Sequence, residues 1–182
     1  MKIQTGMRVA CQTAALATPD RHSSPERVLP SPGLTLVQPL DGEQPEHRSR
    51  DLTGRVLTIL GIDPDTTYQA QLAVQELATN ARRHAPPPHE LHITICTSEV
   101  KIAITDAGPH HEAVAQLLAA ATSSQPEQDA SLLSESGRGL RIIATLFPGA
   151  CGAGPACASS RSRQAKEVWI SVPLPDPIEG KS

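Results

Sequence analysis

The chain has 182 residues, of which 16 are Lys or Arg and 19 are Asp or Glu, so its formal net charge at pH 7 is −3. This near-neutral balance argues against a dedicated nucleic-acid binder, which would carry a basic stripe. No apolar run approaches the roughly 20 residues that cross a bilayer. Only Tyr68, Phe147 and Trp169 are aromatic, while 17 residues are prolines, so the core must be built from Leu, Ile, Val and Ala.

Composition divides the chain into one domain and two tails. We expect residues 1–33 to be a flexible N-terminal tail, residues 34–175 a single domain and residues 176–182 a C-terminal tail. The N-terminal tail is rich in proline and mixed charges and cannot bury enough apolar surface to offset its ordering entropy. Polar residues interrupt its short apolar stretch, which favours a cytoplasmic protein over one with a weak secretory signal.

The four cysteines are dispersed and include no C-x-x-C pair, which argues against a zinc ribbon or a thioredoxin-like site. Cys151 and Cys157 are close enough in sequence to pair under oxidation. Reduced thiols are the favoured alternative for a cytosolic chain.

Apolar periodicity predicts the following elements in chain order. They are an edge strand at 34–37, helices at 51–60 and 66–84, an antiparallel hairpin of strands at 91–96 and 100–104, helices at 112–121 and 139–146, and a last strand at 168–173. Gly61 is expected to end the first helix, and Asp63 to cap the second. Residues 122–135 and 148–165 are predicted to be loops, the first of them mobile.

Three short blocks contain residues that suit chemistry. In the first, Glu76 and Asn80 are four residues apart, so they share one face of the predicted helix. A carboxylate and an amide oxygen held in this way suit activation of a nucleophile and binding of a hard cation such as Mg²⁺. Taken alone, an ordinary solvated polar pair is the more common explanation.

The second block is Asp106-Ala107-Gly108-Pro109, at the end of a predicted strand. There a carboxylate points into a cleft while the backbone turns sharply at the glycine, and it can accept a hydrogen bond from an amino group of a purine. A plain turn is the simpler alternative.

The third block is Gly137-Arg138-Gly139-Leu140, which is expected to open a helix. Backbone N–H groups at a helix N-terminus bind phosphate, and the helix dipole favours the negative charge. Arg138 or Arg141 can add positive charge. Two glycines alone are weak evidence, and a glycine-rich loop before a helix is the alternative.

The three blocks and their order resemble the ATP-binding domain shared by DNA gyrase, the large heat-shock chaperones, sensor histidine kinases and MutL-type repair proteins. The resemblance covers roughly residues 34–175 and is nearest to the single-domain anti-sigma-factor serine/threonine kinases of bacteria. It implies an α/β (α+β) two-layer sandwich of the Bergerat type, with a mostly antiparallel mixed sheet and helices on one face.

By this resemblance, Glu76 matches the general base and Asn80 the ligand of Mg²⁺. Asp106 matches the carboxylate that reads the adenine amino group of ATP, and Gly108 matches the turn that lets the base approach. The segment Gly137-Arg138-Gly139-Leu140 matches the phosphate cradle. The resemblance thus implies ATP and Mg²⁺ as cofactors.

The implied activity is phosphorylation of a small anti-sigma-factor antagonist, which controls a sigma factor. The implied partners are therefore that antagonist and the sigma factor, with no direct nucleic-acid or membrane contact; relatives often form homodimers. His110 and Glu135 depart from the family pattern and favour the alternative, a protein-binding module of the same fold with weak or no nucleotide turnover. A third alternative, the output half of a sensor kinase, is disfavoured because no helix with a phospho-accepting histidine is predicted before residue 51.

Overall fold

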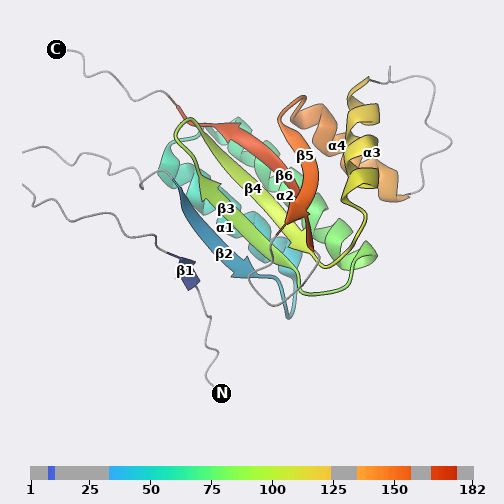
Figure 1. The fold of residues 1–182 in the computed structure, drawn as a ribbon. Coiled ribbons are helices and arrows are strands. Elements are labelled where there is room, and N and C mark those ends of the chain that lie inside the picture. The colour runs from blue at the N-terminus through green and yellow to red at the C-terminus, as the bar shows by residue number, and fades with distance from the viewer. Residues whose placement is uncertain (1–7, 11–32, 124–134, 157–164, 176–182) are drawn as a thin grey trace, which may run out of the picture.

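A sheet of six strands carries the helices of this chain (Figure 1). The structure is a computed structural model and describes residues 8–10, 33–123, 135–156 and 165–175. Within these residues the strand order is β1-β2-β3-β4-β6-β5, and every pairing is antiparallel. The described sheet therefore has no parallel pair of the kind that a mixed sheet contains.

Pairs of strands alternate with pairs of helices along the chain. The strands are β1 (Arg8–Ala10), β2 (Leu34–Pro39), β3 (Glu90–Ile95), β4 (Glu99–Asp106), β5 (Cys151–Ala156) and β6 (Ala165–Pro173). The helices are α1 (Pro45–Leu60), α2 (Pro64–His84), α3 (His111–Ser123) and α4 (Glu135–Leu146). In Figure 1, α1 and α2 lie behind the sheet, while α3 and α4 lie beside β5.

Helix α1 begins six residues earlier than predicted. Its first turns are polar, so apolar periodicity does not reveal them, whereas Pro45 at the first helical position suits a helix start. The end at Gly61 is confirmed. Gly61 takes a φ of 80° and its N–H bonds to the carbonyls of Leu57 and Thr58, as expected for a glycine that terminates a helix.

Helix α2 begins at a side-chain cap, as predicted. The Asp63 carboxylate accepts a hydrogen bond from the Thr66 N–H at 2.8 Å, which satisfies one of the free donors of the first turn. The apolar stripe of this helix is buried, and it consists largely of alanines: Ala70, Ala73, Val74, Leu77, Ala78 and Ala81. Such small side chains allow α2 to lie close to the sheet.

The predicted hairpin is confirmed, and β2 pairs with its first strand. Residues 90–95 of β3 pair antiparallel with 100–105 of β4. β2 is not the edge strand that we expected, because Arg8–Ala10, within the predicted N-terminal tail, pairs with it as β1. The other residues of both predicted tails, apart from Gly33, lie outside the described residues.

The prediction of a loop at 148–165 is wrong for Cys151–Ala156, which form β5. This strand lacks the β-branched residues that mark most strands, and a neighbouring side chain explains why. Gly152 is opposite Trp169 in β6, and a Cβ at Gly152 would lie 2.7 Å from the indole ring. The bulk that β5 lacks is therefore supplied by Trp169. Residues 157–164 lie outside the described residues.

Helix α3 matches its prediction closely, whereas α4 begins at Glu135, four residues before the predicted start. The glycine segment is therefore part of the helix instead of a loop in front of it. The predicted mobile loop at 122–135 is helical at its two ends, and residues 124–134 lie outside the described residues.

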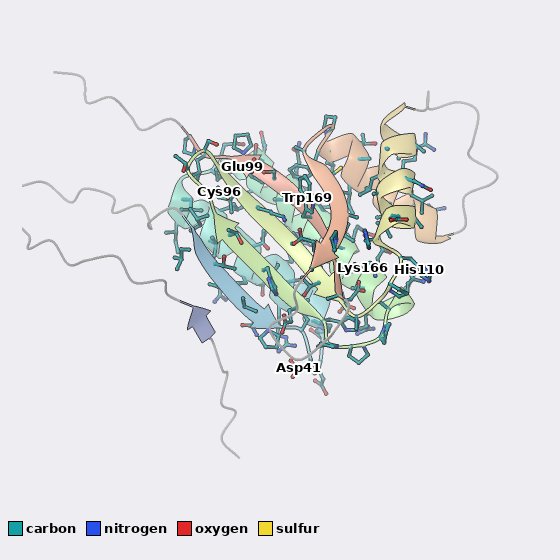
Figure 2. The ribbon with its side chains drawn as sticks, viewed as in Figure 1. Asp41, Cys96, Glu99, His110, Lys166 and Trp169 are labelled. Carbon is teal, nitrogen blue, oxygen red and sulfur yellow. The ribbon has the colours of Figure 1, made fainter. Side chains whose placement is uncertain are left out.

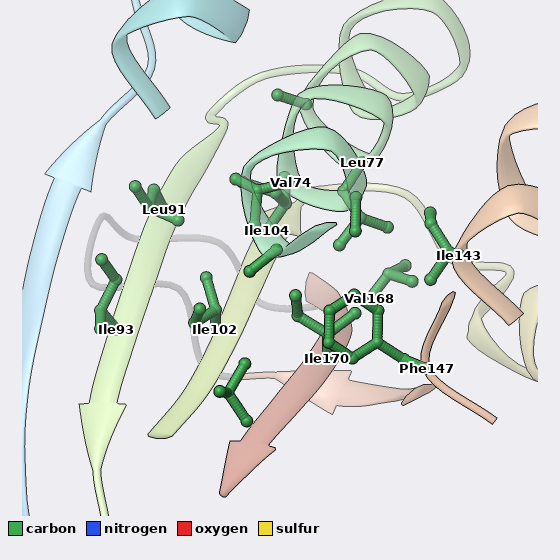
Figure 3. Close-up of a cluster of buried hydrophobic side chains, with 14 of the residues drawn as sticks. Val74, Leu77, Leu91, Ile93, Ile102, Ile104, Ile143, Phe147, Val168 and Ile170 are labelled. Carbon is green, nitrogen blue, oxygen red and sulfur yellow. The ribbon is translucent and has the colours of Figure 1, made fainter. Parts of the chain in front are cut away.

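The core lies between the sheet and the helices and is almost entirely aliphatic (Figure 3). Alternate residues of the central strands face the helices and are buried, among them Leu91, Ile93, Ile102, Ile104, Val168 and Ile170. Helix α4 contributes Ile143, and Phe147 follows it as the one aromatic ring of this cluster. The aliphatic core expected from the composition is confirmed.

The α/β two-layer architecture expected from the sequence is thus confirmed, with helices packed on one face of an antiparallel sheet. Cys96 and Cys151 are free thiols, while Cys11 and Cys157 lie outside the described residues. Within the described residues no helix is both long and apolar enough to cross a membrane.

Replacing Ile143 with alanine should lower the free energy of unfolding by about 2–5 kcal/mol, because the fully buried side chain leaves a cavity between α4 and the sheet. Ile59→Ala on α1 is the matched control. That side chain is 68% exposed, so the change should stay within about 0.5 kcal/mol. Urea denaturation measures both, and equal losses would contradict this placement of the core.

The pKa of Asp63 is held below its ordinary value of 3.8 by the hydrogen bond from the Thr66 backbone N–H. The ionised form is favoured in the native state, so its stabilising effect is complete above pH 3.8 and is lost as the pH falls through the lower native value. Asp63→Ala should therefore be less stable than wild type at neutral pH, and the difference should shrink in acid. Asp65→Ala, in the same turn, is the control and should give a smaller difference in urea denaturation at each pH.

Candidate functional site

Helix α2 places the two residues of the first block against helix α4. A Cβ added at Gly139 would lie 2.9 Å from Glu76 Oε2 and 3.1 Å from Asn80 Nδ2. Any larger residue at position 139 would therefore displace both groups. The carboxylate and the amide meet at one point on the α4 backbone, although Glu76 and Gly139 are more than 60 residues apart in sequence.

The amide of Asn80 has unused hydrogen-bonding capacity. Its Nδ2 is buried and has no hydrogen-bond partner among the described residues, and a buried polar group without a partner costs free energy. The two ends of an amide exchange when it is turned over, so the same place can present either the nitrogen or the oxygen. A ligand at this point would supply the missing partner.

The other members of the glycine segment are placed differently. Gly137 lies in the first turns of α4, and Arg138, the next residue, has an exposed side chain. Leu140 belongs to the buried hydrophobic cluster, so its side chain packs the helix onto the core. Of this segment, Gly139 is the residue that the structure brings against Glu76 and Asn80.

Asp106 ends β4 on the face of the sheet that the helices cover, and it is 2% exposed. Its Oδ1 accepts a hydrogen bond from the Gly108 N–H at 2.8 Å, which fixes the tight turn expected there. The Ala107 N–H bonds in turn to the carbonyl of Pro86, just after α2. This hydrogen bond holds the end of β4 next to the C-terminal end of α2, the helix that contains Glu76 and Asn80.

Lys166 is a member of this site that the sequence analysis missed. It stands opposite Asp106 in the β4–β6 ladder, and its Nζ forms a buried ion pair with Asp106 Oδ1. Lys166 is labelled in Figure 2. A signal was available in the alternation of β6, because Lys166 shares its face with Val168, Ile170 and Val172. The predicted strand began at Val168 and so excluded the lysine.

The space next to Gly108 is filled from within the chain. A Cβ at Gly108 would lie 2.7 Å from Lys166 Nζ, 2.9 Å from Asp106 Oδ1 and 3.3 Å from the Ala85 Cβ. Glycine is therefore required at this position for the ion pair to fit. The resemblance implies that the base approaches this turn at Gly108. In the structure, the ammonium of Lys166 lies on that side of the turn.

His110 and Glu135, the two positions that depart from the family pattern, reveal little about the site. His110 is exposed at the start of α3, and the side chain of Glu135 lies outside what the structure describes. Trp169 lies on the sheet face opposite Asp106, because residues of odd and even number point to opposite sides of β6.

A comparison with known protein families matches residues 43–149, more than half of the chain, to the histidine kinase-like ATPase domain. The matched region contains both α2 and the glycine segment of α4, so it spans the Glu76–Asn80–Gly139 contact. A search of curated proteins finds no match. The chain belongs to the family of histidine kinase-like ATPase domains.

Proposed function

We propose that this protein binds ATP with Mg²⁺ and phosphorylates a serine or threonine of a small partner protein. The observation that supports the proposal most directly is the meeting of Glu76, Asn80 and Gly139 at one point. The family match adds an independent reason, because this family is defined by an ATPase domain.

The donor set at this point fits a Mg²⁺–phosphate group. Mg²⁺ commonly takes one or two protein oxygens and completes its shell with phosphate and water, so the Asn80 amide is a sufficient ligand from this chain. The buried amide position of Asn80 has no hydrogen-bond partner among the described residues, so a Mg²⁺–phosphate group would find a free polar group there. The absence of a side chain at Gly139 is what lets Glu76 and Asn80 come together against the α4 backbone. The metal ion would neutralise the charge that develops on the phosphates.

In the proposed function, Glu76 is the base that receives the proton of the attacking hydroxyl group. Its carboxylate is half-buried on α2, one turn before Asn80. A base and a metal ligand one helical turn apart hold the attacking hydroxyl and the phosphate in a fixed relation, which is most of what phosphoryl transfer requires.

The proposal also includes a regulatory role and the partner proteins that this role requires. The sequence resembles the single-domain anti-sigma-factor kinases through its three blocks and their order. We therefore propose an anti-sigma-factor antagonist as phosphate acceptor and a sigma factor as the regulated protein, with a homodimer as the working assembly.

A second candidate function is supported by the Lys166–Asp106 pair. Because this pair fills the place expected for the base, the domain can also serve as a protein-binding module with weak or no nucleotide turnover. The two functions differ in whether Mg²⁺-ATP binds and whether its phosphate is transferred.

Calorimetric titration of Mg²⁺-ATP tests the phosphate end of the site. Asn80→Ala should weaken binding at least about tenfold, the effect of removing one charge-assisted contact of about 1.5 kcal/mol. The increase in ATP affinity that wild type shows when Mg²⁺ is added should also disappear in this variant. Thr79→Ala is the matched control, because its hydroxyl bonds to the Gln75 carbonyl of its own helix. Absence of ATP binding to wild type would contradict the proposal.

Glu76→Gln should retain ATP binding and lower phosphoryl transfer about 10²–10⁴-fold, the usual contribution of a general base. Labelled ATP and purified candidate antagonist proteins measure the transfer. Asp51→Asn, an exposed acid on α1, is the control and should transfer phosphate at the wild-type rate. If wild type binds ATP and modifies none of the candidates, the protein-binding module becomes the better explanation.

A further inference from the structure

The ion pair between Lys166 and Asp106 joins two residues that the sheet register holds face to face. They are cross-strand partners in β4 and β6, and both side chains point to the face that the helices cover. The side chain of Lys166 is 10% exposed and that of Asp106 is 2% exposed. A lysine in such a place is held by its partner, because an unpaired buried ammonium is strongly disfavoured.

The same carboxylate has a second fixed donor. Asp106 Oδ1 accepts from the Gly108 N–H as well as from Lys166 Nζ, so backbone and lysine both converge on one oxygen atom. The amino group of a purine that approached this oxygen would be a third donor, and its partly positive hydrogens would lie beside an ammonium. The lysine ammonium and the purine amino group therefore compete for this oxygen.

The turn at Gly108 was the expected entry for the base, and the lysine also occupies its open side. The position of a Cβ at Gly108 lies 2.7 Å from Lys166 Nζ. A base lying against this glycine would thus contact the ammonium as well as the carboxylate. Close contact between a 6-amino purine and Asp106 Oδ1 therefore requires that Lys166 move.

We propose that Lys166 determines which purine the site accepts, because its ammonium takes the place at Asp106 that the amino group of adenine would occupy. The inference rests on the proposed nucleotide binding. A 6-oxo purine offers a carbonyl oxygen that accepts from the lysine and an N1–H that donates to the carboxylate. Lys166 therefore weakens ATP binding and reduces the preference for a 6-amino over a 6-oxo purine.

The chain contains a matched control pair. Lys101 forms an ion pair with Glu167 between the same two strands, but on the opposite face of the sheet, where it also lies 5.5 Å from the centre of the Trp169 ring. Replacing Lys101 removes an equal charge from the same strand pair and leaves Asp106 untouched.

The test is calorimetric titration of the full chain with Mg²⁺-ATP and Mg²⁺-ITP, which differ at the 6-position of the purine. Lys166→Met should bind ATP at least about tenfold more tightly than wild type, the worth of one charge-assisted hydrogen bond, and should not gain affinity for ITP. Lys101→Met should leave both affinities unchanged, and Lys166→Arg should behave as wild type.

Two results would overturn the inference while leaving the proposed function in place: equal ATP affinity of wild type and Lys166→Met, or equal gains for ATP and ITP. If no variant binds either nucleotide, the proposed function fails and this inference fails with it.

Lys166→Met leaves Asp106 buried without its cation, so the double variant Asp106→Asn/Lys166→Met provides a neutral pair that folds more readily. It should bind ATP more tightly than Asp106→Asn alone, and equal binding by the two would count against the competition.

Discussion

The close approach of helix α2 to its neighbours is the constraint on which the rest of this structure depends. Its buried stripe is built largely of alanines, among them Ala70, Ala73 and Ala81, and its partner α4 presents Gly139. Small residues let backbones approach to within the reach of short side chains. Glu76 and Asn80 directly precede Leu77 and Ala81 of this stripe, and both lie against α4.

Local physical chemistry made the α2 region predictable. Asp63 followed by Pro64 favours a helix start, since one supplies the cap and the other a preset φ. The spacing of Glu76 and Asn80 fixes their common face. The resemblance drawn from three short blocks agrees with the family to which residues 43–149 belong. Their individual roles at the site stay predictions, because they concern a ligand rather than the fold.

Other parts depended on contacts between distant segments, which no local pattern contains. In β5, Gly152 lies opposite Trp169, whose ring leaves no room for a side chain there, and the residues of β5 carry no strand signal of their own. The start of α4 at Glu135 is similarly hidden, because two glycines lower the helix propensity of its first turns. Lys166 was missed because a charged residue interrupts the apolar alternation from which the last strand was predicted.

The two ends of the candidate site differ in what they need from a ligand. At Asn80 a buried amide position has no partner among the described residues, so a bound group would relieve an existing cost. At Asp106 the chain supplies its own cation, and the carboxylate is already compensated. A buried carboxylate without Lys166 would depend on a ligand or a proton for compensation. The lysine frees the folded domain from that dependence, and this same contact is the one with which, in our proposal, the base competes.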